Sequence, residues 1–307
     1  MSKSLIALTV FTLTLAPSSH AQQAASPDAA ALNKQAQDLE SSGKRKEALP
    51  LFRRVAEKDP ANVDANLGIG RVLNIDGQYA EARRHFQKAL DAASESEMNE
   101  ALSDMAISYA FEGNAAEAAK YYGRLIDRHI KAGATDAAGG AANGLGRVYL
   151  ETGDTASAEK WYRTGYESAM KNEKRTPAQT DLAEMRWHHA QARIAVRRKQ
   201  FDVARKHVDE VRALVARGTL AEAQNAQYPH VAGYVALYEG NLDKAIAELS
   251  KADQRDPFIL SLLAQAYEQK QDMTRARELY TKILEMPDHS LQAAFARPLA
   301  ARRLAAR

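Results

Sequence analysis

The chain has 307 residues, of which 45% are hydrophobic and 26% are charged, and it contains no cysteine. The hydrophobic fraction excludes a mostly disordered chain, and the lack of cysteine excludes disulfides, thiolate metal sites and a lipid anchor on cysteine. The formal charge of +3 creates no overall field that would select nucleic acid or membrane as a partner.

The first 21 residues have the features of a secretory signal peptide. Lys3 supplies a positive charge, residues 5–16 form a short apolar stretch, and a small-x-small pattern ends at Ala21. A helix that spans a bilayer needs about 20 apolar residues, so this stretch is too short to be a stable anchor. We expect cleavage after Ala21, a periplasmic or secreted mature chain, and a flexible tail over residues 22–28.

A repeat organises the rest of the chain. Each copy has a turn residue, an alanine five residues later and, in most copies, a large apolar residue four positions further on, as in Gly43, Ala48 and Phe52. A small residue also stands twelve positions before each alanine. Such spacing predicts two antiparallel helices that cross closely at small residues and must stack on neighbouring pairs to bury their apolar faces. The turn residues of the seven copies are Gly43, Gly77, Gly113, Gly153, Lys199, Gly240 and Gln271.

This pattern resembles the tetratricopeptide repeat (TPR) family, most closely at Gly144–Tyr149 followed by Gly153. The resemblance implies an all-α, right-handed α-solenoid of about seven TPR repeats with a C-terminal capping helix. We expect repeats one to four over residues 29–172, a polar connector over 173–184, repeats five to seven over 185–290, and the capping helix over 291–307. The connector predicts a bend near residue 175, and Pro298 is expected to kink or restart the last helix.

Catalytic motifs are absent from the sequence. It has no nucleophile elbow and no zinc-binding helix motif. His188 and His189 are adjacent, so on a helix they point about 100° apart and are poorly placed to hold one metal ion. We therefore expect no catalytic residue, no metal site and no cofactor.

The resemblance implies that fixed positions of each first helix line a concave groove. The residues of this chain at those positions that we select as a partner-binding groove are Arg71, Asn74, Asn143, Arg147, His189, Arg193, Tyr234 and Tyr238. Arginines with asparagine and histidine neighbours suit carboxylates or a peptide backbone, and tyrosines add aromatic contact. The pattern favours a protein or peptide partner, in particular an acidic one.

Three functions are consistent with these features. The first is a non-enzymatic periplasmic TPR scaffold or adaptor in envelope assembly or secretion. The second is a TPR component of an exopolysaccharide export system, in which the basic strip over residues 193–217 would contact an anionic polysaccharide. The third, an enzyme with an unrecognised site, ranks lowest because nearly all of the mature chain is repeat. Nucleic acid is not expected as a partner outside the cytoplasm.

Overall fold

Residues 27–306 are described in a computed structural model, in which all regular structure is helical. The signal peptide predicted for residues 1–21, and residues 22–26 of the predicted tail, lie outside the described residues. The helices are α1 (Pro27–Ser41), α2 (Arg45–Lys58), α3 (Val63–Ile75), α4 (Tyr79–Ala92), α5 (Met98–Phe111), α6 (Ala115–Lys131), α7 (Thr135–Thr152), α8 (Thr155–Met170), α9 (Pro177–Arg197), α10 (Phe201–Ala216), the 3₁₀ helix η1 (Glu222–Ala226), α11 (Gln227–Glu239), α12 (Leu242–Leu249), α13 (Pro257–Gln269), α14 (Met273–Glu285) and α15 (Leu291–Ala305).

Helices α1 to α14 form seven consecutive antiparallel pairs, which confirms the predicted all-α solenoid of seven repeats. One residue with positive φ stands in the turn of every pair. Five of the seven are glycines, whereas Lys199 and Gln271 adopt φ of 59° and 64°. The turn therefore needs a left-handed residue even where the sequence does not supply glycine.

Aromatic rings occupy the places where small residues let the helices approach. A Cβ atom on Gly70 of α3 would lie 2.4 Å from Phe86 of α4, within the same pair. A Cβ atom on Gly68 would lie equally close to Phe52 of α2, in the preceding pair. Both rings are fully buried. The small residues thus create the space into which the large residue of each repeat packs.

The connector between repeats four and five is shorter than predicted. Helix α9 begins at Pro177, inside the range 173–184, because Thr176 forms a capping box with Gln179 and a proline is compatible with the first helical turn. The apolar core changes here, from a cluster that extends from α1 to α7 to one that extends from α9 to α13. The bend near residue 175 stays a prediction.

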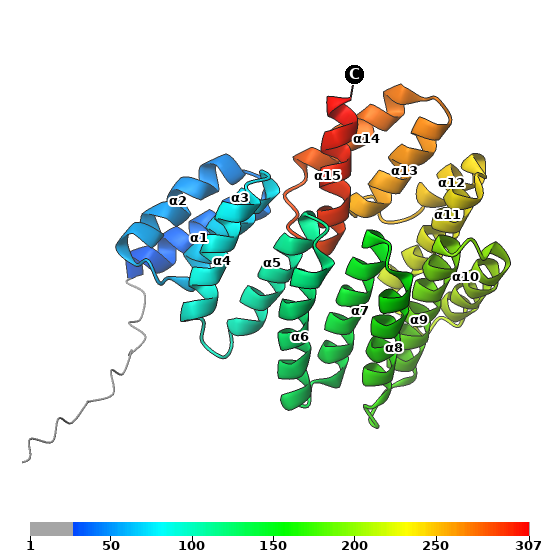
Figure 1. The fold of residues 1–307 in the computed structure, drawn as a ribbon, viewed down its shortest axis with the longest axis horizontal. Coiled ribbons are helices and arrows are strands. Elements are labelled where there is room, and N and C mark those ends of the chain that lie inside the picture. The colour runs from blue at the N-terminus through cyan, green and yellow to red at the C-terminus, as the bar shows by residue number, and fades with distance from the viewer. Residues whose placement is uncertain (1–26, 307) are drawn as a thin grey trace, which may run out of the picture.

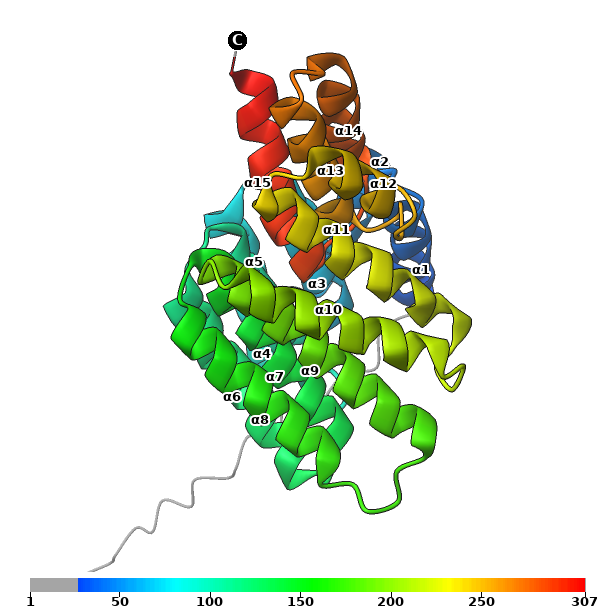
Figure 2. The same cartoon turned by 90° about the vertical axis from the view of Figure 1, so that its right-hand side faces the viewer.

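The last helix does more than cap the seventh repeat. Helix α15 packs on α13 and α14, and it also contacts α5 and α7 from the first half of the chain. Figure 1 shows α15 (red) between α5 and α13, and Figure 2 shows the same helix from the side. The curved row of repeats therefore returns towards its own first half, and α15 lies across its concave side. Pro298 lies inside α15, which continues through it to Ala305, so the helix does not restart there.

Two charged contacts hold α15 and the preceding loop against the first half. The buried Arg297 donates to the carbonyl oxygens of Ile283 and Met286, both at 2.9 Å, and of Ile75 at 3.4 Å. Nδ1 of His289 lies 3.3 Å from the carboxylate of Asp104 in α5. Among residues 27–306, no helix combines the length and apolar character needed to cross a membrane.

Candidate functional site: the concave groove

Arg71 is held by acidic side chains of its own chain. Its guanidinium lies 3.0 Å from Glu40, 3.0 Å from Glu100 and 3.2 Å from Asp104. Burial acts to lower the pKa of Arg71, but these carboxylates, Asp104 foremost, raise it above its usual range. The charge of Arg71 is thus neutralised within the fold, and this residue joins the first three repeats.

Asn74 is also removed from the accessible groove. Its side chain is fully buried, and neither its amide nitrogen nor its oxygen has a hydrogen-bond partner in the described part of the chain. Asn74 directly precedes Ile75, whose carbonyl oxygen accepts from Arg297 of α15, so the C-terminal segment contacts the fold next to this position.

Four of the predicted groove residues meet around one cavity, which we call the polar cavity. It has a volume of about 450 Å³ and is lined by residues of α7, α8, α9, η1, α11 and the starts of α13 and α15. The predicted residues that line it are Asn143, Arg147, His189 and Arg193. The regular repeat spacing brings these side chains together because α7 and α9 are the first helices of successive pairs.

The charged groups of the polar cavity are buried and only partly paired. Arg193 donates to the hydroxyl of Tyr162 at 2.7 Å, and its Nη1 lies 3.8 Å from Glu151. The guanidinium of Arg147 stacks on the ring of Phe258, 4.5 Å from its centroid, and makes no ion pair with any described residue. Burial, and then the nearby Arg193, lower the pKa of Arg147.

The remaining two predicted residues belong to a second region of the groove, the aromatic cavity. Its volume is about 320 Å³, and it lies between α5, α7, the end of α9, α11, α13 and α15. Tyr238 lines it and is 39% exposed, whereas Tyr234 is fully buried beneath it, with the two ring centroids 4.7 Å apart. Arg197 donates to the Tyr234 hydroxyl at 3.0 Å and to Glu151 at 2.7 Å.

Several residues of the groove are not among those that we selected from the sequence. His230 lines the polar cavity, and the repeat register places it at the same groove position as His189. Asp256 and Phe258 stand at the start of α13, and Phe295 stands on α15. No motif marks these three, because they reach the groove only through the curvature of the whole solenoid.

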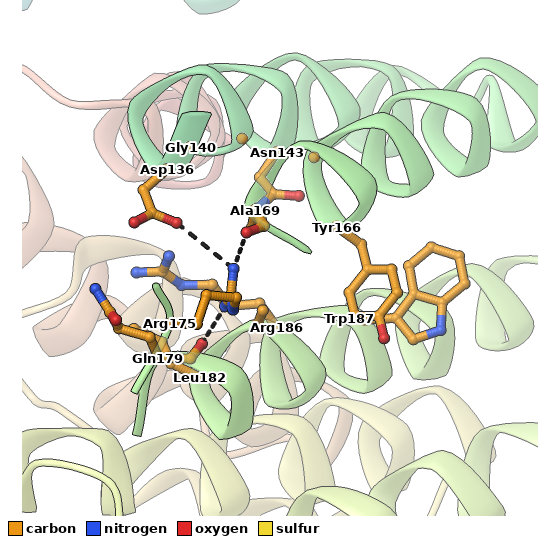
Figure 3. Close-up of a pocket in the computed structure, with 13 residues that line it drawn as sticks. Asp136, Gly140, Asn143, Tyr166, Ala169, Arg175, Gln179, Leu182, Arg186 and Trp187 are labelled. Carbon is orange, nitrogen blue, oxygen red and sulfur yellow. Dashed lines mark hydrogen bonds and ion pairs between the residues drawn. The ribbon is translucent and has the colours of Figure 1, made fainter. Parts of the chain in front are cut away.

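A third, smaller cavity of about 170 Å³ lies beside the connector of repeats four and five. Figure 3 shows Arg175 pointing into the space between α7 and α9. Its guanidinium donates to the carbonyl oxygens of Ala169 and Gln179 and lies 3.6 Å from Asp136. The charge of Arg175 therefore holds the connector in place and is not free for a ligand.

The basic strip over residues 193–217 is largely neutralised. Its arginines pair with acids as follows: Arg193 and Arg197 with Glu151, Arg198 with Glu159, Arg205 with Asp202 and Glu239, Arg212 with Asp209, and Arg217 with Asp181 and Glu184. A polyanion would have to displace these acids at the arginines, and only Lys199 and Lys206 of the strip make no ion pair with a described residue.

The two adjacent histidines point to different neighbours. Nδ1 of His188 lies 2.9 Å from Nδ1 of His207, whereas the ring of His189 packs edge-on against His230. No group of three or more histidine, aspartate or glutamate side chains within residues 27–306 is arranged to hold a metal ion.

Comparison with known proteins gives two matches at the level of sequence families. Two sequence models of the tetratricopeptide repeat match the chain, one over residues 33–97 and 230–290 and the other over residues 97–171. No curated protein matches the sequence significantly.

Similar solved structures are distant in sequence. A tetratricopeptide repeat protein from Parabacteroides merdae ATCC 43184 is 14% identical, with a TM-score of 0.55 over 90% of this chain and 100% of its own. A putative kinesin light chain with nearly identical TPR-like repeats from Podosopora anserina is 16% identical, with a TM-score of 0.51 over 62% of this chain and 95% of its own. At these identities the similarity concerns the fold alone. The family matches span more than half of the chain, and they show that this chain belongs to the tetratricopeptide repeat family.

Proposed function

We propose that the protein is an exported, non-enzymatic TPR scaffold that binds a protein or peptide partner at the aromatic cavity of its concave side. Tetratricopeptide repeats build protein-interaction scaffolds that are typically non-catalytic. The observation that carries the proposal is Tyr238, a large aromatic side chain that is 39% exposed in the groove rather than packed in the core. Aromatic residues in such positions contribute strongly to binding energy at protein interfaces.

The chemistry of the aromatic cavity indicates the kind of segment that fits. Tyr238 and the half-buried Phe295 present apolar surface. Arg302 is exposed at the same cavity and makes no ion pair with a described residue. A peptide segment with an apolar side chain next to an aspartate or glutamate would place the apolar group on Tyr238 and Phe295 and the carboxylate on Arg302. This restricts the acidic-partner hypothesis from the whole groove to the end near α15.

Affinity capture from the native envelope, with proteins identified by mass spectrometry, tests this surface. We expect Tyr238→Ala and Arg302→Glu each to reduce recovery of the same partner about tenfold or more, since removal of an interface anchor costs about 2 kcal/mol. The matched control is Val203→Ala, which removes a comparably exposed apolar side chain in α10, outside the cavity. Equal recovery by all four proteins would refute the proposed surface.

Export is proposed from the signal peptide and has its own test. Cell fractionation is expected to place the protein outside the cytoplasm, and N-terminal sequencing of that fraction is expected to begin at Gln22. A cytoplasmic protein that retains Met1 would contradict export but would leave the partner-binding surface unaffected.

A further inference from the structure

The polar cavity contains more buried hydrogen-bonding capacity than the protein satisfies. Arg193, His189 and His230 line it and are only 5%, 8% and 5% exposed. The Nε2 atoms of both histidines and the Nε and Nη1 atoms of Arg193 are buried without a hydrogen bond to any of residues 27–306. A buried polar group left without a partner is costly, so the residues that line this cavity would be stabilised by a ligand that supplies such partners.

Arg147 adds a second incompletely paired cation. Its Nε and Nη2 atoms are buried and make no hydrogen bond, and it has no ion-pair partner among the described residues. Phe258 supports one face of its guanidinium, which fixes the plane of the donors. A guanidinium held in this way offers a forked pair of N–H donors that matches an oxyanion.

The charges around the polar cavity do not balance. Arg147, Arg186 and Arg193 line it, with Asp256 as the one acidic residue among the described lining residues. Glu151, 3.8 Å from Nη1 of Arg193, lies behind the lining and is shared with Arg197. Oδ1 of Asp256 caps α13 by accepting from the backbone nitrogens of Phe258 at 2.7 Å and Ile259 at 3.4 Å, and its single negative charge is smaller than the charge of the three arginines. Like charges repel strongly where water is partly excluded, and a bound anion would relieve that repulsion.

The two imidazoles supply neutral polar groups beside these cations. Their rings are 4.8 Å apart. Burial, together with the charges of Arg193 and Arg147, holds the pKa of His189 and of His230 well below its usual range. Each ring is therefore neutral at pH 7, and its unpartnered Nε2 can donate or accept a hydrogen bond without adding charge.

We propose that the polar cavity is a binding site for a small organic oxyanion, with Arg147 and Arg193 donating to its carboxylate or phosphate group. His189 and His230 bind a second polar group of the same ligand. The volume of about 450 Å³ is that of a small-molecule site, which sets it apart from a surface for a folded partner. The inference goes beyond the proposed scaffold function, since Tyr238 and Arg302 line the other cavity.

Binding is tested on the mature chain, in a buffer without multivalent anions, by calorimetry and thermal unfolding. The probes are succinate, inorganic phosphate and succinamide, which has the shape of succinate without its charges. We expect succinate or phosphate to bind with 1:1 stoichiometry and to raise the unfolding temperature, whereas succinamide does neither. Binding of succinate alone assigns a carboxylic acid, and binding of phosphate alone assigns a phosphorylated ligand; both results support the oxyanion site.

The variant Arg147→Met separates a binding role from a structural one. We expect it to weaken anion binding about tenfold or more and to raise the unfolding temperature of the free protein, because it removes a buried cation that has no counterion. A residue with only a structural role would lower that temperature when replaced. The matched control is Arg163→Met in α8, whose side chain is 56% exposed and outside the cavity, and which should bind like the wild type.

A second variant keeps the proposal testable if Arg147→Met does not fold. Arg186 lines the cavity with an exposed side chain and makes no ion pair within residues 27–306, so Arg186→Met should fold normally and weaken binding about threefold. The proposal is overturned if neither anion binds more tightly than succinamide, or if the folded arginine variants of the cavity bind as well as the wild type.

Discussion

At the scale of single residues, glycines in the helix interiors set how closely the helices pack. Gly70 faces the ring of Phe86, and Gly68 faces the ring of Phe52, with no room for a methyl group at either position. The intrinsic helix propensity of glycine is poor, costing about 1 kcal/mol relative to alanine. The chain therefore gives up local helix stability at these positions to bury a full aromatic ring.

Two glycine-to-alanine substitutions should have opposite effects on stability. In Gly70→Ala the new methyl group overlaps the buried Phe86 ring, so we expect the free energy of unfolding to fall by about 1–3 kcal/mol. In Gly123→Ala, in α6, no atom that the structure describes lies within 4 Å of the new Cβ, and we expect a gain of about 0.5–1 kcal/mol. Urea denaturation measures both. A loss at Gly123 as large as that at Gly70 would contradict the packing argument.

The residue scale is also where sequence reasoning succeeded most. The small residues at the crossings and the seven turn positions follow from spacing within one repeat, which is a local property of the chain. Lys199 and Gln271 show how far this holds, because the register alone identified two turns without glycine and both adopt positive φ. A pattern based on glycine content would have missed them.

At the scale of elements, α15 differs from the fourteen helices before it. It contacts helices of the last repeat and of the third and fourth repeats. Phe295 packs against both large core clusters, and Arg297 hydrogen-bonds to carbonyls at the ends of α3 and α14. This helix therefore joins the two halves of the solenoid, a role that a terminal cap of an open repeat array does not have.

Replacing Arg297 should reveal how much the contact between α15 and the first half contributes to the free energy of unfolding. In Arg297→Ala, the carbonyls of Ile75, Ile283 and Met286 lose a buried donor, and Arg45 remains for Met286 alone. We expect a loss of about 2–4 kcal/mol, measured by chemical denaturation.

The matched control for this junction is Arg303→Ala on the same helix. Its side chain is 48% exposed and lies 3.3 Å from Glu268 at the surface. An exposed ion pair of this kind contributes about 0–1 kcal/mol, so the expected loss is correspondingly small. Equal losses in the two variants would show that Arg297 does not hold the two halves together.

The placement of α15 could not be predicted from the sequence. Its apolar and arginine residues indicated a helix over 291–307, and the helix begins at Leu291. Its docking depends on the curvature accumulated over all preceding repeats, because the Arg297 and Ile75 groups that meet are 222 residues apart in sequence. Local spacing likewise could not show that Asn74 is fully buried in the folded chain, although we selected it for the groove. Nor could it show that Phe258 and Phe295 line the groove.

At the scale of the whole molecule, buried histidines make stability depend on pH. Burial lowers the pKa of His85, His129, His188, His189, His207 and His230 below the usual value of 6.5, most strongly for His189 and His230. The unfolded chain takes up protons at these residues as the pH falls through 6.5, while the folded protein does not. The stability is therefore fully present above pH 6.5 and is lost as the pH decreases towards the folded-state pKa values.

Urea denaturation between pH 7.5 and 5.5 tests this dependence. We expect the free energy of unfolding of the wild type to decrease over this range by on the order of 1 kcal/mol for each strongly shifted histidine. In the double variant His189→Gln and His230→Gln, the free energy of unfolding should change visibly less with pH. Arg147, Arg193 and Asp256 also face this pair, and burial raises the pKa of Asp256, so the slope that remains in the double variant includes any uptake of a proton by Asp256. Unchanged stability down to pH 5.5 would contradict the expectation.

The contact between α15 and the first half also affects how the protein is made. A ribosome adds about 5–20 residues per second, so the 222 residues between Ile75 and Arg297 take roughly 10–45 seconds to synthesise. During that interval the carbonyl end of α3 and the inner side of α5 lack their final neighbour. Early repeats can stack as they emerge, but the last helix determines when the nascent molecule is complete.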